Sequence, residues 1–417
     1  MNKALRLRCV TTLSATLEFY DFTLLIFLAP VIAKVFFPGT EGLSTVMPVL
    51  LLFFAGYLAR FVGGLVYSHT GDRHGRKASY IYSIVTMSLA TLGIGLLPGY
   101  AQWGELAPLG LLVLRILQGF SLGGEIPGAV VFAAEHTETN KRGLVTGLVI
   151  SGVTFGNVLA SGVVGLLYFC FSDETVIAWG WRLAFILGSG LGLLSLWLRM
   201  SLEETPVFRS LEPSQDRVWP LKKLVQDHSL SLVRGTLVAA LPAISLSVLF
   251  YMPRYQQEFL KIPSEVAFSM STSAFLLLTG ITLIMAILSD KIGRLSMIRV
   301  GSFIFMLLPT GFCLMTCQAF SPILALMPLL LGCGMVMGVY ESSMAELFPT
   351  RARYSGVAFC HNLAFAFFGG ITPIILEWMC ARGWLLAPAF LPVGMALLLY
   401  LSSLGWEDRY RKDLTYI

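Results

Sequence analysis

Long apolar stretches separated by polar segments recur along nearly the whole chain. Most of them have about 18 residues or more, which is enough for a helix to cross a hydrocarbon layer of ~30 Å. Backbone polar groups inside a membrane must find partners within the protein, so the spans must be helices or a closed barrel. Barrel strands alternate apolar and polar residues, whereas these stretches are continuously apolar. The pattern therefore predicts an all-α polytopic membrane protein.

The apolar stretches predict twelve transmembrane helices in two six-helix bundles. Their ranges are 10–36, 46–68, 78–98, 107–133, 143–169, 180–200, 232–252, 265–288, 296–317, 321–344, 355–379 and 384–405. Most connections are short, but residues 201–231 are polar and charged and contain three prolines. This segment divides the chain into two halves. The predicted parts are an N-terminal bundle (1–200), a cytoplasmic central loop (201–231), a C-terminal bundle (232–405) and a cytoplasmic tail (406–417).

Charge supports a membrane protein and gives it an orientation. Charged residues make up only 13% of the chain, against about 25% in a soluble domain. Lysine and arginine gather near both termini, in the central loop and in alternate connections, and such residues favour the cytoplasmic side. We therefore predict that both termini are cytoplasmic and that the protein lies in the plasma membrane, or in the inner membrane if it is bacterial. The same placement explains the net charge of +5 without nucleic acid as a partner.

The two halves resemble distant copies of each other. HTGDRHGRKAS (69–79) follows the second span, and LSDKIGRLSM (288–297) follows the eighth. AAEHTETNKRG (133–143) and MAELFPTRARYSG (344–356) correspond in the same way after spans four and ten. Paired six-span halves are a transporter architecture with a substrate site near the midplane between them.

These inner connections contain candidate residues of a cytoplasmic gate. An aspartate there can accept charge-assisted hydrogen bonds from a helix end or an arginine, and the glycines permit tight turns. Such a cluster can hold one conformation closed. The alternative is that the basic residues only set the topology. The candidate gate residues are Gly71, Asp72, Arg73, Arg76, Glu135, Arg142, Asp290, Arg294, Glu346 and Arg351.

Span one contains two carboxylates, Glu18 and Asp21, in the stretch SATLEFYDFTLLIF. Each costs about 2.5–3.5 kcal/mol at a helix centre, so both are expected to face the bundle interior. Burial favours the protonated form of a carboxyl group, and a nearby guanidinium favours the ionised form. A group balanced between these effects can bind and release a proton. The alternative is a permanently paired structural carboxylate.

Other polar residues inside the predicted spans are candidates for substrate binding. In span four, Arg115, Gln118 and Glu125 share one helix face. Arg115 is the expected partner of an anionic substrate or a coupling switch, unless it forms a structural ion pair. Arg60 in span two, Tyr340 and Asn362 are further candidates, with packing as the alternative. His361 is interpreted as an interior histidine with satisfied hydrogen bonds rather than as a proton relay.

Motifs for catalysis are absent from the sequence. It contains no GxxxxGK[ST] phosphate loop, and the seven cysteines have no metal-ligand spacing. No Ser/His/Asp arrangement stands out. The chain is therefore predicted to be neither an enzyme nor a cofactor- or metal-binding protein.

Several of these motifs together resemble a known family. GDRHGRK is similar to the loop signature of the major facilitator superfamily, SDKIGRL to its degenerate second copy, and RILQGFSLGGE (115–125) to its fourth-helix motif. Within that superfamily, four stretches resemble the metabolite:proton symporter family: LEFYDF (17–22), LARFVGG (58–64), WGWRLAF (179–185) and AELFPTRARYSG (345–356). The first of them contains Tyr20. That family carries organic acids and osmolytes, among them citrate, 2-oxoglutarate, shikimate, and proline or betaine.

The chain departs from the family pattern at three places that leave the substrate open. It has EFYDF where the family prefers Glu-Trp-Tyr-Asp-Phe, Ile126-Pro127 after GGE where the family has an aromatic residue, and His74 in the loop in place of an aliphatic residue. The resemblance implies a candidate site that includes Tyr20 besides the residues named above.

The function predicted from the sequence is secondary active transport by alternating access. The expected substrate is a small organic anion or zwitterion, such as an organic acid, an amino acid or a betaine, carried in symport with protons by a monomer in the lipid bilayer. Glu18 and Asp21 would bind the protons, and Arg115 the anion. A proton-antiporting exporter or an uncoupled facilitator is the alternative, and a receptor that reuses the fold is a third possibility.

Overall fold

The computed structural model describes residues 3–39, 45–74, 76–135, 137–200, 220–316 and 321–410, and every regular element among them is a helix. The helices of the N-terminal half are α1 (Lys3–Phe27), α2 (Ala29–Phe36), α3 (Met47–His74), α4 (Arg76–Leu96), α5 (Tyr100–Trp103), α6 (Leu106–Leu122), α7 (Glu125–Glu135), η1 (Thr139–Lys141), α8 (Arg142–Cys170), α9 (Asp173–Thr175), η2 (Val176–Gly180) and α10 (Trp181–Met200).

The second half begins after the central segment. Its helices are α12 (Pro220–Asp227), α13 (Ser229–Glu258), α14 (Ser264–Ile292), α15 (Arg294–Ile304), η3 (Phe305–Leu307), α16 (Leu308–Thr316), α17 (Pro322–Ala325), α18 (Met327–Met337), α19 (Tyr340–Ala345), α20 (Thr350–Ala364), η4 (Phe365–Gly369), α21 (Gly370–Cys380) and α22 (Ala387–Ser403).

Each predicted span coincides with one of these helices or with consecutive helices. Nine helical segments of the described residues are long and apolar enough to cross a membrane, and Ile81–Leu96 and Ala387–Ser403 are shorter apolar helices. The remaining predicted span is divided into α17, α18 and α19. The all-α polytopic fold class is therefore confirmed. Most of the predicted central loop lies outside the described residues, and its end forms α12.

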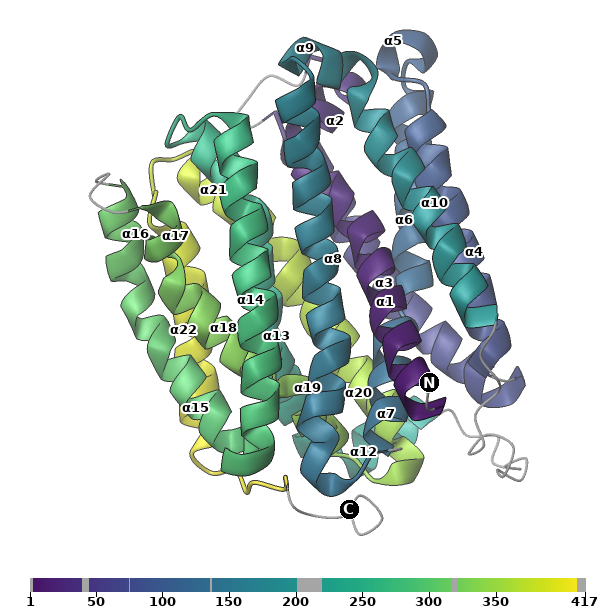
Figure 1. The fold of residues 1–417 in the computed structure, drawn as a ribbon, viewed down its shortest axis with the longest axis vertical. Helices are drawn as coiled ribbons and strands as arrows, with labels where there is room; N and C mark the ends of the chain where they lie inside the picture. Colours follow the sequence, from purple (N-terminus) through teal and green to yellow (C-terminus); the bar gives the residue numbers. More distant parts are fainter. Residues whose placement is uncertain are drawn as a thin grey trace.

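The helices of the two halves stand side by side, with α1 to α10 in one group and α13 to α22 in the other (Figure 1). Contact between the groups is made by α8 with α14, by α3 with α20 and α21, and by α1 with α13. The beginning of α1 and the end of α22 lie toward the same end of the molecule (Figure 1). We call this end, which the charge pattern predicts to be cytoplasmic, the inner end, and the opposite end the outer end.

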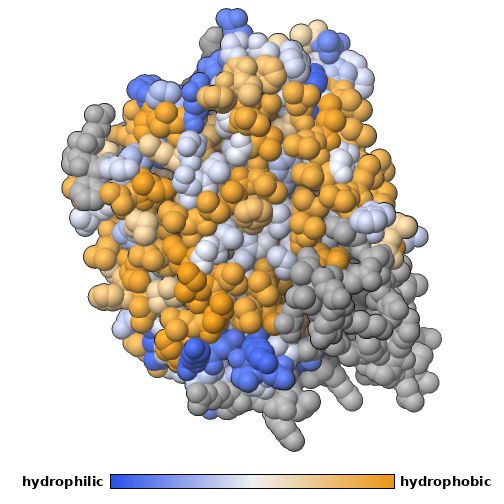
Figure 2. Space-filling view, in the orientation of Figure 1, coloured by the Kyte–Doolittle hydropathy of each residue, from blue (hydrophilic) through white to orange (hydrophobic). Residues whose placement is uncertain are grey.

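The outside of the bundle suits a lipid environment. Figure 2 shows an apolar band across the middle of the visible face, with hydrophilic residues at both ends. Large apolar side chains such as Leu89, Phe169 and Phe303 are more than half exposed. Because contiguous apolar surface of this kind marks contact with a membrane or a partner, the fold and its surface together describe a multi-pass membrane protein.

One seam between the halves, along α8 and α14, is made of small and hydroxyl-bearing residues. Gly147 packs against Ala286 so closely that a Cβ atom on the glycine would collide with it. Further along, Thr279 bonds Thr154 at 3.0 Å and Thr272 bonds Ser161 at 3.1 Å. Each of these four hydroxyl groups also lies within bonding distance of a carbonyl of its own helix. The seam is therefore close but contains no buried charge among these residues.

Within the N-terminal half, α3 and α6 touch backbone to backbone through glycines. A Cβ atom on Gly119 would collide with the carbonyl of Gly56, and one on Gly63 with the carbonyl of Phe120. Small residues allow membrane helices to approach in this way. The contact fixes Arg60 on α3 relative to Arg115 on α6.

We expect Gly119→Val to destabilise the folded protein by about 1–3 kcal/mol, because the added side chain forces the two helices apart. The thermal unfolding midpoint in detergent measures this change. Gly394→Val on α22 is the matched control, since a Cβ atom there meets nothing within 4 Å. Equal midpoints for the two variants would contradict the close contact.

Candidate functional site

A chain of three buried polar residues joins the two halves. Nη2 of Arg60 on α3 lies 2.7 Å from Nε2 of His361 on α20. The other ring nitrogen of His361, Nδ1, lies 2.7 Å from Oε1 of Glu341 on α19. None of the three residues is more than 1% exposed. Charged groups so deep in a membrane protein are costly and usually functional.

Aromatic rings surround this chain from both halves. The guanidinium carbon of Arg60 lies 5.5 Å from the ring centroid of Phe19 and 5.4 Å from that of Phe365. His361 stacks on Phe365 at 4.6 Å and on Tyr340 at 6.1 Å, measured between ring centroids. The rings exclude water and stabilise the cation of Arg60 through their π faces. Tyr340, predicted as a site residue, therefore lies beside His361.

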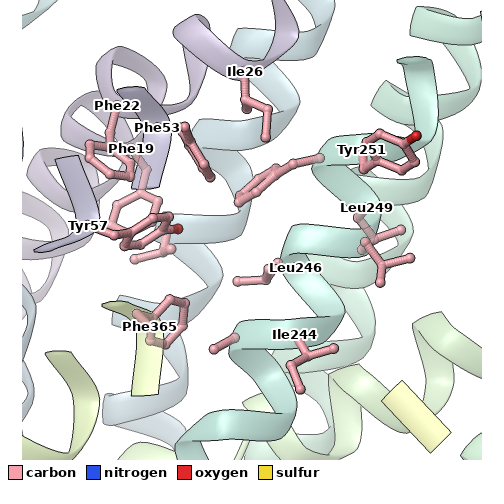
Figure 3. Close-up of a cluster of buried hydrophobic side chains, with 14 of the residues drawn as sticks. Phe19, Phe22, Ile26, Phe53, Tyr57, Ile244, Leu246, Leu249, Tyr251 and Phe365 are labelled. Carbon is pink, nitrogen blue, oxygen red and sulfur yellow. The ribbon is translucent and has the colours of Figure 1, made fainter. Parts of the chain in front are cut away.

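Further contacts between aromatic rings extend from Phe365 across the interface between the halves. We call the set Phe22, Phe27, Phe53, Tyr57, Phe250, Phe275 and Phe365 the aromatic cluster. Phe53 of the first half meets Phe250 of the second at 6.3 Å, and Phe27 meets Phe250 at 5.9 Å. Figure 3 shows Phe22, Phe53 and Tyr57 facing the apolar side chains of α13. The cluster thus lies between the halves rather than inside one of them.

Arg115 lies beside the aromatic cluster. Its guanidinium stacks over Phe22 at 4.0 Å, and its Nη1 donates to the carbonyl of Phe22 at 3.0 Å and to Oε1 of Gln118 at 3.1 Å. Gly56 makes room for it, because a Cβ atom there would lie 2.7 Å from Nε of Arg115. Among the described residues, Nε and Nη2 of this fully buried guanidinium have no hydrogen-bond partner. These donors are available to an anion.

Asp21 connects to Arg115 only through neutral side chains. Its Oδ2 accepts from Thr91 at 3.4 Å, Gln118 donates to Thr91 at 2.8 Å, and Arg115 donates to Gln118. Asp21 also packs against Gly188 and Gly192 of α10, where a Cβ atom on Gly188 would collide with it. The structure therefore places Asp21 inside the N-terminal bundle, near Arg115 but not in a direct ion pair with it.

The remaining site residues predicted in the first half have separate positions. Glu18 is 4% exposed on α1. Tyr20 donates its hydroxyl group to the carbonyl of Ala184 at 3.0 Å, which ties α1 to α10. Glu125, at the start of α7, accepts a hydrogen bond from Ser83 of α4. Glu125 belongs to the charged surroundings of Arg60.

The break between α6 and α7 supplies backbone acceptors to the interface. Gly123 and Gly124 lie between the end of α6 and the start of α7. Asn362 donates its side-chain amide to the carbonyl of Gly123 at 2.8 Å, and Tyr354 donates its hydroxyl to that of Gly124 at 3.1 Å. Asn362, predicted as a site residue, therefore contacts the opposite half.

Ion pairs between the halves close the inner end. Arg142 at the start of α8 bonds Glu346 at 2.9 Å, and Arg294 lies 3.6 Å from the same carboxylate. All three side chains are at most 3% exposed. Asp290 pairs with Arg294 at 2.8 Å. The structure thus brings four of the predicted gate residues into one cluster, which we call the inner latch.

Two further sets of contacts join the halves near the inner latch. Asp290 accepts hydrogen bonds from the backbone amides of Gly143 and Leu144, which caps the N-terminus of α8 from the opposite half. Glu135 pairs with Arg353 at 2.9 Å, again across the halves. The side chains of the other predicted gate residues lie outside the described part of the chain; they are Gly71, Asp72, Arg73, Arg76 and Arg351.

Sequence reasoning did not select Glu341 and His361 as site residues, nor the rings of Phe53 and Phe250. Glu341 and His361 could have been found from the sequence, because a carboxylate and a histidine lie inside two predicted spans of the same half. The partner of His361, Arg60, lies 301 residues away from it. The aromatic residues carried no separate signal, because phenylalanine is common throughout the apolar stretches.

Comparison with known sequences finds a matching family and relatives that are named as transporters. The family model of the Major Facilitator Superfamily matches residues 11–373. A proline/betaine transporter of Salmonella typhimurium is 31% identical, over 97% of this chain and 83% of its own length. The glycine betaine/proline/ectoine/pipecolic acid transporter OusA of Dickeya dadantii is 33% identical, over 98% and 85%. The inner membrane metabolite transport protein YhjE of Escherichia coli is 32% identical, over 91% and 88%.

Solved structures share the fold. The proton:xylose symporter XylE bound to 6-bromo-6-deoxy-D-glucose superposes with a TM-score of 0.82 over 99% of this chain and 98% of its own, at 17% identity. The human organic anion transporter MFSD10 gives a TM-score of 0.73 over 97% and 100%, at 16% identity.

Proposed function

This chain belongs to the Major Facilitator Superfamily, and from that premise we propose that it carries a small zwitterion of the betaine or proline type in symport with protons. It is a secondary transporter of small organic solutes and not an enzyme. The identity of the solute and its coupling to protons are the proposed steps. The names of the curated relatives, two of which include betaine and proline, favour this class of solute.

The observation that carries the proposal is the position of the buried arginines beside the aromatic cluster. Arg115 has two nitrogen donors without a partner among the described residues, and so does Arg60. Buried donors without partners are costly, and an incoming carboxylate would satisfy them. Arginine is also the side chain best suited to hold a planar carboxylate with two parallel hydrogen bonds.

The aromatic cluster suits the other end of a zwitterion. Quaternary ammonium groups are recognised by the π faces of several rings, because they cannot donate hydrogen bonds. Phe53, Phe27 and Phe250 meet from both halves close to Arg115, whose guanidinium lies 5.3 Å from the Phe53 ring. A carboxylate on Arg115 and an ammonium group among these rings would make the solute touch both halves. A solute that contacts both halves can couple its own binding to their movement.

Alternating access follows from the two sets of contacts between the halves. The inner latch holds the inner end closed, and the pair Phe27–Phe268 and the stacked rings of Tyr168 and Phe268 join the halves toward the outer end. Opening one set while keeping the other would expose the site to one side at a time. We include Glu18 and Asp21 as protonatable groups, and the inner latch as the cytoplasmic gate, in this proposal.

The proposal is tested in proteoliposomes that contain the purified protein and an inside-alkaline pH gradient. We expect labelled glycine betaine to accumulate above its external concentration and a protonophore to abolish the accumulation. Accumulation that requires an inside-acidic lumen would indicate an antiporter. Uptake that only equilibrates under every gradient would indicate an uncoupled facilitator. Either of these results would contradict symport.

The same vesicles test the class of solute. The anion 3,3-dimethylbutanoate has the shape of glycine betaine but carries carbon in place of the ammonium nitrogen. A desolvated cation–π contact contributes about 2 kcal/mol, so we expect this anion to compete ~30-fold less well than unlabelled betaine. Equal competition would show that the aromatic cluster does not recognise a cation, and would favour an organic anion as the substrate.

A further inference from the structure

The contact between Arg60 and His361 fixes which ring nitrogen of His361 carries hydrogen. A guanidinium has only donors and is always charged. At 2.7 Å from Nη2 of Arg60, Nε2 of His361 must therefore be the acceptor. The imidazole is then neutral, with its hydrogen on Nδ1, from which it donates to Oε1 of Glu341 at 2.7 Å. Both hydrogen bonds of the chain depend on this one protonation state.

A proton added to Nε2 would break the link between the halves. The nitrogen would become a donor facing another donor at the present distance, and the imidazolium would carry the same sign of charge as Arg60. The new cation would keep its hydrogen bond to Glu341, which belongs to its own half. Protonation would thus replace an attraction across the interface by a repulsion, and would turn the hydrogen bond between His361 and Glu341 into an ion pair inside the C-terminal half.

Two other hydrogen bonds of α20 across the interface, close to His361 along the helix, do not depend on pH in this way. Asn362 donates to the carbonyl of Gly123, and Tyr354 to that of Gly124. Neither carbonyl takes up a proton in the physiological range, and an amide has no charge to change. Farther along α20, Arg353 pairs with Glu135 of the opposite half, and protonation would neutralise that carboxylate. Among the described contacts of α20 with the opposite half, the one with His361 differs because its acceptor lies on α20 and gains a positive charge when it is protonated.

The charged and titratable groups around His361 come from four elements. Arg60 contacts it from α3, where Tyr57 lies beside Arg60, and Glu341 and Tyr340 contact it from α19. Glu125 of α7 acts on Arg60. On α20 itself, Cys360 packs against Gly235 of α13. A protonated His361 would therefore have one carboxylate in direct contact, that of Glu341, and one cation on its other nitrogen, that of Arg60.

From this geometry we infer that His361 is a coupling residue of the transporter, in addition to the protonatable carboxylates of α1: the proton that it binds at Nε2 releases the N-terminal half from α20. This inference deepens the proposed function and rests on proton symport. The proton enters as the Arg60–His361 hydrogen bond breaks, and it leaves when Nε2 returns to Arg60. No other bond is made or broken. His361 acts as a positioning residue between the halves and is not required to touch the solute.

The test compares accumulation ratios at several imposed pH gradients. One proton per solute makes the ratio rise about tenfold for each pH unit. We expect wild type to follow this rise and His361→Gln to lose it, with a ratio near unity at every gradient. Glutamine can accept from Arg60 and donate to Glu341, so His361→Gln should keep the thermal unfolding midpoint, but its amide cannot carry the proton. His228→Gln is the matched control at the start of α13 and should follow wild type.

Glu341→Gln gives a second readout that does not depend on the first variant folding. The amide oxygen still accepts from Nδ1, but the negative charge that stabilises an imidazolium is gone. We expect the pH of half-maximal uptake to move lower by about 1–3 units. A wild-type gradient response in His361→Gln, or an unchanged pH profile in Glu341→Gln, would overturn the inference. The inference would also be overturned if the accumulation ratio ceased to rise with the pH gradient in Asp21→Asn but still rose in His361→Gln. If wild type itself fails to accumulate solute, the proposed function fails instead.

Discussion

Replacing Arg115 by lysine should raise the KM for glycine betaine ~30-fold or more. Lysine keeps the charge but loses the planar set of donors that would hold a carboxylate. It also loses the stack on Phe22 at 4.0 Å and the hydrogen bonds to the Phe22 carbonyl and Gln118. Removing one partner of a buried, charged hydrogen-bonded pair costs about 2–5 kcal/mol, which sets the size of the effect. Initial uptake rates over a range of solute concentrations measure it.

Arg182→Lys is the control for Arg115. This arginine also stacks on an aromatic ring, that of Trp181 at 4.4 Å, and donates to backbone carbonyls. Because it lies at the start of α10, away from the aromatic cluster, we expect its replacement to leave KM unchanged. A wild-type KM in Arg115→Lys would assign Arg115 to packing and would remove the main support for a carboxylate site.

Replacing Glu346 by glutamine should open the inner end. The variant leaves the guanidiniums of Arg142 and Arg294 buried without their shared carboxylate, which they approach to 2.9 Å and 3.6 Å. Removing one partner from a buried ion pair costs about 3–5 kcal/mol. The closed state should therefore lose population by ~100-fold or more relative to the state with the inner end open.

Spin labels at Asn140 and Lys291, which are exposed and belong to opposite halves, report the opening as a longer distance between the labels. Glu138→Gln provides the comparison, because it removes a carboxylate from a pair with Lys141 whose side chains are 70% and 54% exposed. Exposed pairs contribute about 0–1 kcal/mol, so the distance should not change. Identical distributions in both variants and wild type would show that the inner latch does not control the gate.

The sequence predicted the helices well because each membrane span must satisfy its own backbone. Because of that requirement, nearly every membrane-spanning helix is encoded by a long apolar stretch, whichever other helices it packs against. The interruption of the tenth span at α17, α18 and α19 was not predicted, although Pro328 lies at the start of α18 and Gly338 directly after its end. The break at Gly123–Gly124 was also missed, although it supplies the acceptors for Asn362 and Tyr354.

Pairings across the interface were only partly predictable. The internal repeat pointed to Asp290, Arg294 and Glu346 as gate residues, and these do meet, with Arg142. Glu18 and Asp21 were expected to face the bundle interior, and the structure interposes Thr91 and Gln118 between Asp21 and Arg115. His361 does have both ring nitrogens bonded, as an interior histidine should. Periodicity along α20 could not show that one of those partners comes from the other half.

The seam between α8 and α14 sets where the work of opening is done. Thr154, Ser161, Thr272 and Thr279 can part and still bond a carbonyl of their own helix, so separating them strands no donor. Opening along this seam therefore costs little in hydrogen bonds. The charged contacts between the halves, at the inner latch and between Arg60 and His361, contribute more to the energetic barrier. Ionic strength should then regulate the frequency of opening only when salt reaches those charges. The frequency of opening is then set by these charged contacts rather than by the seam.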